Sequence, residues 1–458
     1  MNETKFRIEH DSMGDIKVPA EHYWGAVTER SKENFLIGTE LMPELVLRPV
    51  INIKKSEALA NRDLGNISEE KAKYIVEAAN RALALEDLHS EFPLRVWQTG
   101  SGTQSNMNAN EVLANMGNES AGKKLLHPND DVNKGQSSND VFPSAMQIGF
   151  YEGIHSEILP AIDRLIDSFQ KLEDKYKNKI KVGRTHLQDA TPVTFGQEVS
   201  GWRMMLEKDK GMILEASDHL RDLPLGGTAT GTGLNCSPDQ DTKACEYLSK
   251  IYGHEFTAAA NKFYGMTSKG QISFAHSALR TLAEDMIKIA NDVRWLASGP
   301  RCGIGEIEIP ANEPGSSIMP GKVNPTQSEA LIMVATQIMG NDQVIAIAAS
   351  QGYFELNTYM PLIINNCAQT VSLLGSAIDS FDKMCVKGIK VNDEKMDHYL
   401  EISLMNVTKL SPVIGYEKAA EIAKHAHKNK QSLRQANHDL GYLSDEEFDQ
   451  AMCLEDMI

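Results

Sequence analysis

Two serines, a lysine and an asparagine that could move protons lie within one short run rich in glycine and proline. The run is Gly315–Pro325, and its reactive side chains are those of Ser316, Ser317, Lys322 and Asn324. Glycine and proline at this density exclude a regular helix and predict a shaped loop. A hydroxyl beside a cation and an amide donor suits the removal of a proton next to a carboxylate, because negative charge then builds on the substrate.

The run differs from a phosphate-binding Walker A loop. Gly315 and Gly321 are one residue too far apart for that motif, and Val323 follows the lysine where a magnesium-binding serine or threonine would stand. Taken alone, the run could equally be a surface turn with a solvated lysine. Other parts of the chain have to decide between the two interpretations.

Four further polar segments have the composition of binding loops and lie between stretches of helical periodicity. They are Gln98–Asn110, His127–Asp140, Gly183–Thr194 and Leu223–Asn235. The first segment offers uncharged hydroxyls and amides for carboxylate oxygens, although Asn106 and Asn108 could instead cap the helix that follows. The second segment could be a surface loop rich in Asn and Asp.

The third and fourth segments contain a histidine and a glycine run. His186 can take or give a proton near neutral pH, although a lone histidine can also be merely hydrogen-bonded. The run Gly226–Gly233 superficially resembles a dinucleotide-binding loop. It lacks the G-x-G-x-x-G spacing and a preceding strand, so it predicts no NAD site.

Apolar residues recur at helical spacing along most of the chain. Three amphipathic stripes are expected at 154–172, 272–296 and 361–381, and a segment at about 326–350 is apolar on most sides. Such a helix is buried, and in a long bundle the covering surface can be another subunit. Small helices are expected after Val391, where Ser444 and Glu447 form the pattern of a capping box.

The composition is that of a soluble globular protein. The 458 residues, 41% hydrophobic and 24% charged, predict two or three domains or one very elongated domain. With 46 Lys and Arg against 63 Asp and Glu, the net charge of −17 disfavours nucleic acid and anionic membranes as partners. A small dianion is compatible with this charge, because salt screens charges beyond about 10 Å and a few cations in a cleft then outweigh them.

We expect a cytoplasmic protein without a metal centre. The N-terminus has no apolar stretch of signal length, and no segment has eighteen consecutive apolar residues. Six cysteines lie far apart without a C-x-x-C pair, which predicts reduced thiols. His425 and His427 would point to different faces of a helix, and the sequence has no H-E-x-x-H or calcium-loop pattern.

A fifth predicted loop, Arg301–Thr326, contains the Gly315–Pro325 run. Together the five loops resemble those of the fumarase/aspartase superfamily, and most closely those of its class II fumarate hydratases. The resemblance covers nearly the whole chain, from Asp11–Gly14 to Gly415–Ala420, and Gly315–Pro325 is similar to the specific superfamily signature. Within the superfamily, three features favour the fumarate hydratases: Gly321 before the lysine, Thr326-Gln327 after the Asn-Pro pair, and the run Ser137–Pro143.

The resemblance implies a mainly all-α fold with three domains. These are an N-terminal, mostly helical domain (1–137), a central bundle of long helices (138–391) and a small C-terminal helical domain (392–458). Four such bundles would form the twenty-helix core of a homotetramer, in which each active site draws loops from three subunits. This assembly would cover the helix that is apolar on most sides.

The resemblance also implies an activity, the reversible hydration of fumarate to (S)-malate in the tricarboxylic acid cycle. Water would add in the anti sense through an aci-carboxylate intermediate, without a cofactor or a metal. Alternatives are aspartate ammonia-lyase or another lyase of the superfamily, a catalytically silent structural homologue, and a helical interaction scaffold. The presence of Ser316, His186, Lys322 and Glu329 argues against a silent homologue.

By the same resemblance, Ser316 is the catalytic base, although the sequence leaves open whether Ser316 or Ser317 ionises. His186 is the second acid–base group, working through a water and paired with Glu329, and Lys322 stabilises the developing charge. The implied substrate-binding residues are Ser101, Gly102, Thr103, Ser137, Ser138, Asn139, Thr185, Ser317 and Asn324. A secondary dicarboxylate site is implied at Lys124, His127, Pro128, Asn129 and Asp130, with Lys124 where some relatives have arginine.

Overall fold

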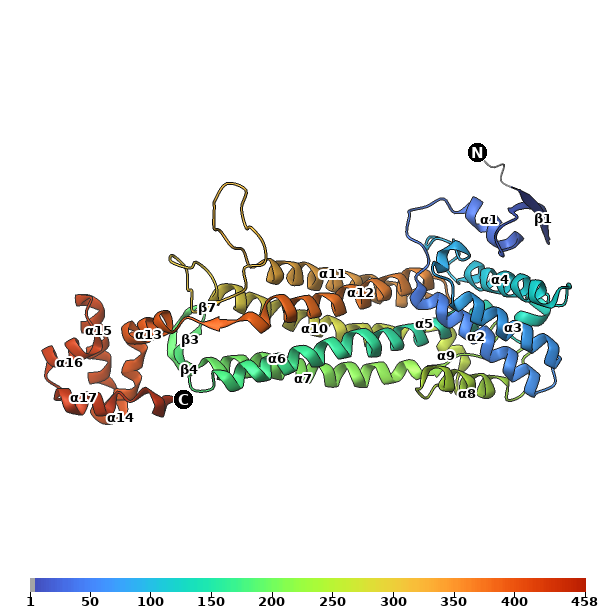
Figure 1. Cartoon of the computed structure of the whole chain (residues 1–458). Coiled ribbons are helices and arrows are strands. Elements are labelled where there is room, and N and C mark those ends of the chain that lie inside the picture. Colours follow the sequence, from blue (N-terminus) through green and yellow to red (C-terminus); the bar gives the residue numbers. More distant parts are fainter. Residues whose placement is uncertain (1–4) are drawn as a thin grey trace. The chain divides into compact units, whose positions relative to one another are not determined.

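Residues 5–458 are described by a computed structural model in which α-helices predominate and each sheet has only two strands (Figure 1). These residues form two compact units. Unit 1 consists of the residues up to Pro160, Asp209–Ala283 and Thr336–Gly375, and unit 2 of Ala161–Lys208, Glu284–Ala335 and Ser376–Ile458. The mainly all-α fold is therefore confirmed, whereas the division into three domains expected from the sequence stays a prediction.

Long helices contribute residues to both units. They are α6 (Leu159–Lys175), α7 (Phe195–Asp218), α10 (Gly270–Leu296), α11 (Thr326–Ala349) and α12 (Met360–Met384). The helices expected at 272–296, 326–350 and 361–381 are confirmed. The stripe expected at 154–172 begins in a π-helical turn, Ile154–Ile158, that joins α5 to α6. A periodicity of 3.6 residues does not reveal such a turn, because it differs from an α-helical turn by a single residue.

Unit 1 contains a set of shorter elements. Its helices are α1 (Ala26–Asn34), α2 (Glu44–Asp63), α3 (Glu69–Leu83), α4 (Thr103–Ala121), α5 (Ser138–Gly153), α8 (Gln240–Tyr252) and α9 (Lys262–Thr267). Its strands are β1 (Phe6–Asp11), β2 (Gly14–Pro19), β5 (Asp222–Leu223), β6 (Thr257–Ala258), β8 (Gly352–Tyr353) and β9 (Leu356–Asn357). Strands β5 and β6 are parallel, and the other two pairs in this unit are antiparallel hairpins.

Helix α2 packs closely against α5 in unit 1. A Cβ atom on Gly149 of α5 would lie 1.8 Å from the carbonyl oxygen of Leu45 in α2. Only glycine permits this approach, and most residues of α2 are buried. The contact matters for the site described below, because α5 carries one of its polar groups.

Unit 2 combines the remaining elements. Its strands are β3 (Ile180–Thr185), β4 (Gln188–Thr194), β7 (Ile307–Glu308) and β10 (Lys390–Val391). Its short helices are α13 (Asp393–Ile402), α14 (Ser411–Ile414), α15 (Tyr416–Asn429), α16 (Leu433–Leu440) and α17 (Asp445–Ala451). The expectation of a loop at Gly183–Thr194 is wrong, because these residues form most of the antiparallel β3–β4 hairpin.

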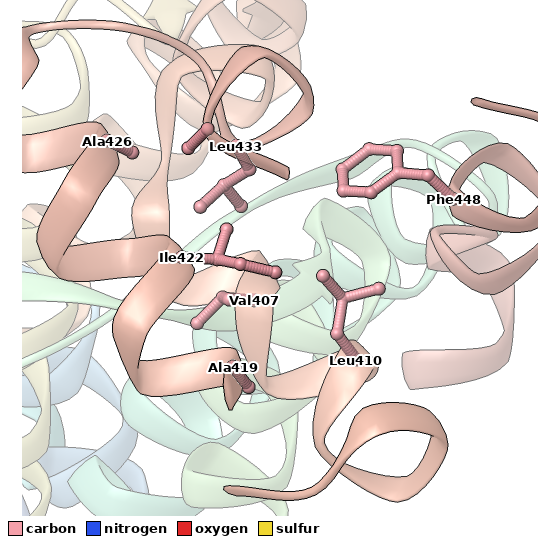
Figure 2. Close-up of a cluster of buried hydrophobic side chains, with 8 residues drawn as sticks. Val407, Leu410, Ala419, Ile422, Ala426, Leu433 and Phe448 are labelled. Atoms are coloured by element: carbon pink, nitrogen blue, oxygen red, sulfur yellow. The ribbon is translucent and has the colours of Figure 1, made fainter. Parts of the chain in front are cut away.

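The C-terminal helices of unit 2 enclose a small apolar core of their own (Figure 2). It contains Val407, Leu410, Ala419, Ile422, Ala426, Leu433, Ala436 and Phe448. The predicted capping box is confirmed at the start of α17, where Ser444 and Glu447 bond each other's backbone N–H groups. These short helices are thus fixed by capping and by side-chain burial rather than by length.

Helix α11 remains largely uncovered within one protomer. It is long and apolar enough to cross a membrane by length and composition, yet only 28% of its most apolar window is buried in the protomer. Met333 is 68% exposed and Ile347 is 56% exposed. The sequence predicted a buried helix here, whereas most of this window is not buried within the chain.

The close contact of α2 and α5 can be tested by adding one methyl group. We expect Gly149→Ala to destabilise the protein by about 1–3 kcal/mol, because the new Cβ collides with a backbone oxygen rather than a movable side chain. The measurement is the midpoint of thermal unfolding followed by circular dichroism. Gly211→Ala in α7 is the control, since a Cβ there meets no atom within 4 Å. Equal midpoints for the two variants would contradict the prediction.

Candidate active site

Three hydroxyl side chains meet where two helices of unit 1 begin. Ser101 Oγ lies 2.8 Å from Thr103 Oγ1, and Thr103 Oγ1 lies 2.9 Å from Ser138 Oγ. Thr103 opens α4 and Ser138 opens α5. The first N–H groups of a helix have no partner within the helix, and the helix dipole favours an anion at this end. This hydroxyl cluster (Ser101, Thr103 and Ser138) is therefore suited to bind a carboxylate.

Close backbone approaches hold the α4 side of the hydroxyl cluster. Gly102 caps α4 in the left-handed conformation, with φ +71°, and a Cβ there would lie 2.4 Å from the ring of Phe142. The carbonyl of Gly100 accepts a hydrogen bond from the Met360 N–H at 3.0 Å. Because α4 already begins at Thr103, the alternative in which Asn106 or Asn108 caps this helix is wrong.

A buried carboxylate organises the α5 side. Ser137 and Asp140 form a capping box, and Asp140 Oδ2 also accepts the N–H groups of Gly226 and Thr228, both at 3.0 Å. Burial raises the pKa of the Asp140 carboxyl, and these backbone donors oppose the rise. The Asn139 amide donates to the carbonyl of Ala229 at 2.9 Å. The glycine run that resembled a nucleotide loop thus supports the start of α5.

In unit 2, His186 stands at the tip of the β3–β4 hairpin. Thr185 pairs with Gln188, so His186 and Leu187 form a two-residue turn, with φ +57° and +58°. Two left-handed residues are the pattern of a type I′ turn, which Asn-Gly would normally occupy. Left-handed geometry in residues other than glycine costs about 1 kcal/mol or more at each position and is concentrated at functional sites. The turn exposes the imidazole at the expense of local stability.

A buried ion-pair network anchors the base of this hairpin. The Arg184 guanidinium binds the Glu306 carboxylate through two hydrogen bonds of 3.0 and 2.9 Å, and Glu306 is fully buried. The ammonium of buried Lys181 lies 3.2 Å from Glu306 and 3.1 Å from Glu198 on α7. Burial acts to lower the pKa of Arg184, but Glu306 outweighs it and the pKa is raised. Sequence analysis missed this network, and nothing local signals it, because Glu306 is 122 residues away from Arg184.

The Gly315–Pro325 loop, predicted from the sequence, gives Ser316 two donors. The N–H groups of Ile318 and Met319 donate to Ser316 Oγ at 3.2 and 3.0 Å. Both donors would stabilise a serine alkoxide, since hydrogen bonds to a charged form favour that form. Ser317 is the more exposed of the two serines. The two serines therefore differ in exposure and in the donors directed at Ser316, and the sequence does not reveal this difference.

The same loop is closed by its own polar groups. The Gly315 N–H donates to the carbonyl of Lys322 at 2.8 Å, and the Asn324 amide donates to the carbonyl of Gly315 at 2.7 Å. The Lys322 ammonium donates to Asn324 Oδ1 at 2.6 Å. Two N–H bonds of the lysine and one of the amide stay available for a ligand. Lys322 and Asn324 line a cavity of about 540 Å³ that Arg294, a further cation, also lines.

The predicted acid–base pair is not assembled within one protomer. Glu329 lies exposed in the first turn of α11, and His186 is exposed at the hairpin tip. Over residues 5–458, no hydrogen bond or ion pair joins these two side chains. The hydroxyl cluster belongs to unit 1, and the hairpin and the Ser316 loop belong to unit 2.

The residues of the expected secondary site lie at the surface of unit 1. His127 caps a π-helical turn, Pro128–Val132, and its Nδ1 accepts the N–H groups of Asn129 and Asp130. Nδ1 also lies 3.3 Å from the Asp130 carboxylate, and Lys124 is exposed nearby in sequence. Within the described part of the chain, no group of three or more His, Cys, Asp or Glu side chains could hold a metal ion.

Comparison with known proteins identifies the family of this chain. Residues 14–340 match the sequence profile of a family described as lyase, and residues 407–458 match that of the fumarase C C-terminus. The chain is therefore a lyase, built on the long-helix fold described above. Relatives from Helicobacter pylori (strain J99) and Bacillus subtilis (strain 168), both described as fumarate hydratase class II, are 54% and 53% identical to it over 99% of each protein. The chain belongs to the class II fumarate hydratase family.

The fold comparison gives the same result. The crystal structure of recombinant class II fumarase from Schistosoma mansoni matches with a TM-score of 0.96 and 41% sequence identity, covering 99% of each chain. The resemblance inferred from the five loops is thereby confirmed.

The ion pair beneath His186 can be tested by its effect on stability. We expect Arg184→Met to destabilise the protein by about 2–4 kcal/mol, because it leaves the buried Glu306 carboxylate with Lys181 alone. The midpoint of thermal unfolding measures the effect. Arg164→Met is the matched control: it removes a partly exposed pair with Asp379, for which less than about 1 kcal/mol is expected. A larger shift for the control would refute the role of the buried pair.

Proposed function

We propose that this chain catalyses the reversible hydration of fumarate to (S)-malate by anti addition of water through an aci-carboxylate intermediate. Support comes from its membership of the class II fumarate hydratase family and from three structural elements that each carry the required chemistry. The observation that carries the proposal is the loop that directs two N–H groups at Ser316 Oγ and presents the Lys322 ammonium. No redox step occurs, because hydration only adds and removes the elements of water.

In the direction from malate to fumarate, Ser316 acts as the base. A serine hydroxyl is too weak an acid to ionise unaided near neutral pH, so the alkoxide needs stabilisation. The N–H groups of Ile318 and Met319 supply it. The alkoxide removes the proton from the carbon beside one carboxylate, and that carboxylate becomes a doubly negative aci-carboxylate. This geometry favours Ser316 over Ser317 as the base.

Donors then stabilise the extra charge on the substrate. Lys322 and the free N–H of Asn324 bind the aci-carboxylate, and a donor placed in this way contributes about 10²–10³ in rate. The hydroxyl cluster binds carboxylate oxygens at the helix N-termini. Gly102, Ser137, Asn139, Thr185 and Ser317 complete the proposed substrate-binding set. These groups act together only if they are gathered around one substrate.

His186 protonates the leaving hydroxyl through a water molecule, and Glu329 orients the imidazole. Both side chains are exposed in one protomer, at a hairpin tip and at a helix start. We propose that they pair between subunits. The active site is then a property of the assembly, with loops from three subunits.

The assembly that we propose is a cytoplasmic homotetramer whose core contains α11 from each subunit. The uncovered apolar surface of α11 supports this proposal, because exposed apolar patches of such length mark interfaces. Four central bundles would form a twenty-helix core. By interconverting fumarate and malate, the enzyme would serve the tricarboxylic acid cycle. We further propose the secondary dicarboxylate site at Lys124 and His127–Asp130, which the exposure of Lys124 and His127 supports.

Replacing the proposed base should separate the two serines. We expect Ser316→Ala to lower kcat for fumarate hydration by about 10²–10⁴-fold, the range that a positioned general base contributes. The rate is measured from the ultraviolet absorbance of the fumarate double bond. Ser317→Ala should retain more activity, and the reverse order would assign the base to Ser317. Wild-type protein that releases ammonia from aspartate but does not hydrate fumarate would refute the proposed reaction.

Charging the surface of α11 should break the tetramer. We expect Met333→Glu to give species smaller than four times 50.6 kDa by light scattering, because a carboxylate would be buried without a partner. Hydration activity should fall with the tetramer. Tyr416→Glu, at a side chain 80% exposed in the C-terminal helices, is the control and should keep the wild-type mass. An unaltered mass for Met333→Glu would exclude this helix from the core.

A further inference from the structure

Lys54 is a charged residue on the buried face of α2. It is 0% exposed and lies among the buried apolar residues of that helix. Its ammonium donates to Asn133 Oδ1 at 2.7 Å and to Gln136 Oε1 at 2.8 Å. Both acceptors belong to the segment that leads directly into Ser137 and Ser138. A lysine buried this deeply is uncommon unless its partners require it.

Asn133 extends this contact to the other side of the hydroxyl cluster. Its Oδ1 also accepts the side-chain N–H groups of Asn106 and Asn110, both at 3.2 Å and both in α4. One oxygen therefore receives donors from α2 and from two positions of α4. The amide of Asn133 donates to the carbonyl of Gln136 at 3.1 Å, which closes the segment on itself. The Asn133 side chain thus links α4 to the segment that leads into α5.

The carboxylates near Lys54 accept hydrogen bonds from other groups. Glu57 accepts a hydrogen bond from Gln240 at 2.7 Å, and Asp140 accepts backbone N–H groups. Burial lowers the pKa of Lys54 to about 7, and the charges of Asp140 and Glu57 oppose this. Burial raises the pKa of Glu57 to about 8. Holding an ammonium on two neutral oxygens is costly, so the cost needs a function to offset it.

We propose that Lys54 is a positioning residue: through Asn133 and Gln136 it fixes Ser138 against Thr103, and so sets the spacing of the hydroxyl cluster for a substrate carboxylate. This inference rests on the proposed binding of a dicarboxylate at that cluster. Lys54 lies beneath the cluster and does not contact the substrate. Its loss should therefore weaken binding more than it slows the chemical step at Ser316.

The test compares Lys54→Met with Lys55→Met in the full-length protein. Lys55 is the next residue of α2, and its ammonium bonds Asn80 at the surface. For Lys54→Met we expect KM for fumarate and the inhibition constant of succinate to rise about tenfold, with kcat within about threefold of wild type. Lys55→Met should match wild type in all three constants. A role limited to stability would lower the unfolding midpoint but leave KM and the succinate constant unchanged.

Gln136→Leu provides a second variant if Lys54→Met fails to fold, because Gln136 is only half-buried. It removes one of the two acceptors, so a smaller rise in KM, about threefold, is expected. Unchanged KM and succinate inhibition in a folded Gln136→Leu or Lys54→Met would overturn the inference, as would a loss confined to kcat. Failure of the wild-type protein to hydrate fumarate would instead refute the proposed function and is seen before any variant is made.

Discussion

The structure depends on one electrostatic requirement. A site for a dianion must offer free N–H and O–H groups that no carboxylate of the protein itself neutralises. Two buried carboxylates that support elements of the proposed site, Asp140 and Glu306, are occupied by internal donors. Asp140, at the start of α5, accepts the backbone N–H groups of Ser137, Gly226 and Thr228. Glu306 is occupied by Arg184 and Lys181 below the hairpin. The hydroxyl cluster and the Ser316 loop therefore keep their N–H and O–H groups available for a ligand.

The elements that support these donors contain features that cost stability. His186 and Leu187 adopt left-handed geometry without glycine, and Lys54, Lys181 and Glu306 are charged groups at buried positions. Replacing buried ion pairs by apolar residues is often neutral or stabilising, so stability alone does not explain them. These buried charged groups restrict the positions of the polar groups that they bond. Apolar packing restricts such positions less, because it is not directional. Close glycine contacts at Gly100, Gly102 and Gly149 have the same effect on the backbone.

Sequence-based prediction succeeded where the signal is local. The long helices α6, α10, α11 and α12 were found from apolar spacing, and the Ser316 loop from its glycines and prolines, whereas α7 was not predicted. It failed at Gly183–Thr194, where strand pairing across a two-residue turn of His and Leu has none of the usual turn residues. It also missed Lys54. This lysine falls on the helical spacing of the buried residues of α2, so the apolar periodicity of the sequence could have revealed it.

The sequence by itself determined the family and the mainly helical class and predicted the reactive side chains, since each depends on residue type and short spacing. Only the tertiary structure decided which groups support them. Arg184 meets Glu306 across 122 positions, and Lys54 meets Asn133 across 79. Such contacts are selected by the packing of whole helices and hairpins, and no local propensity encodes them. Likewise, the two N–H groups at Ser316 Oγ follow from the folded path of the loop, which distinguishes Ser316 from its neighbour Ser317.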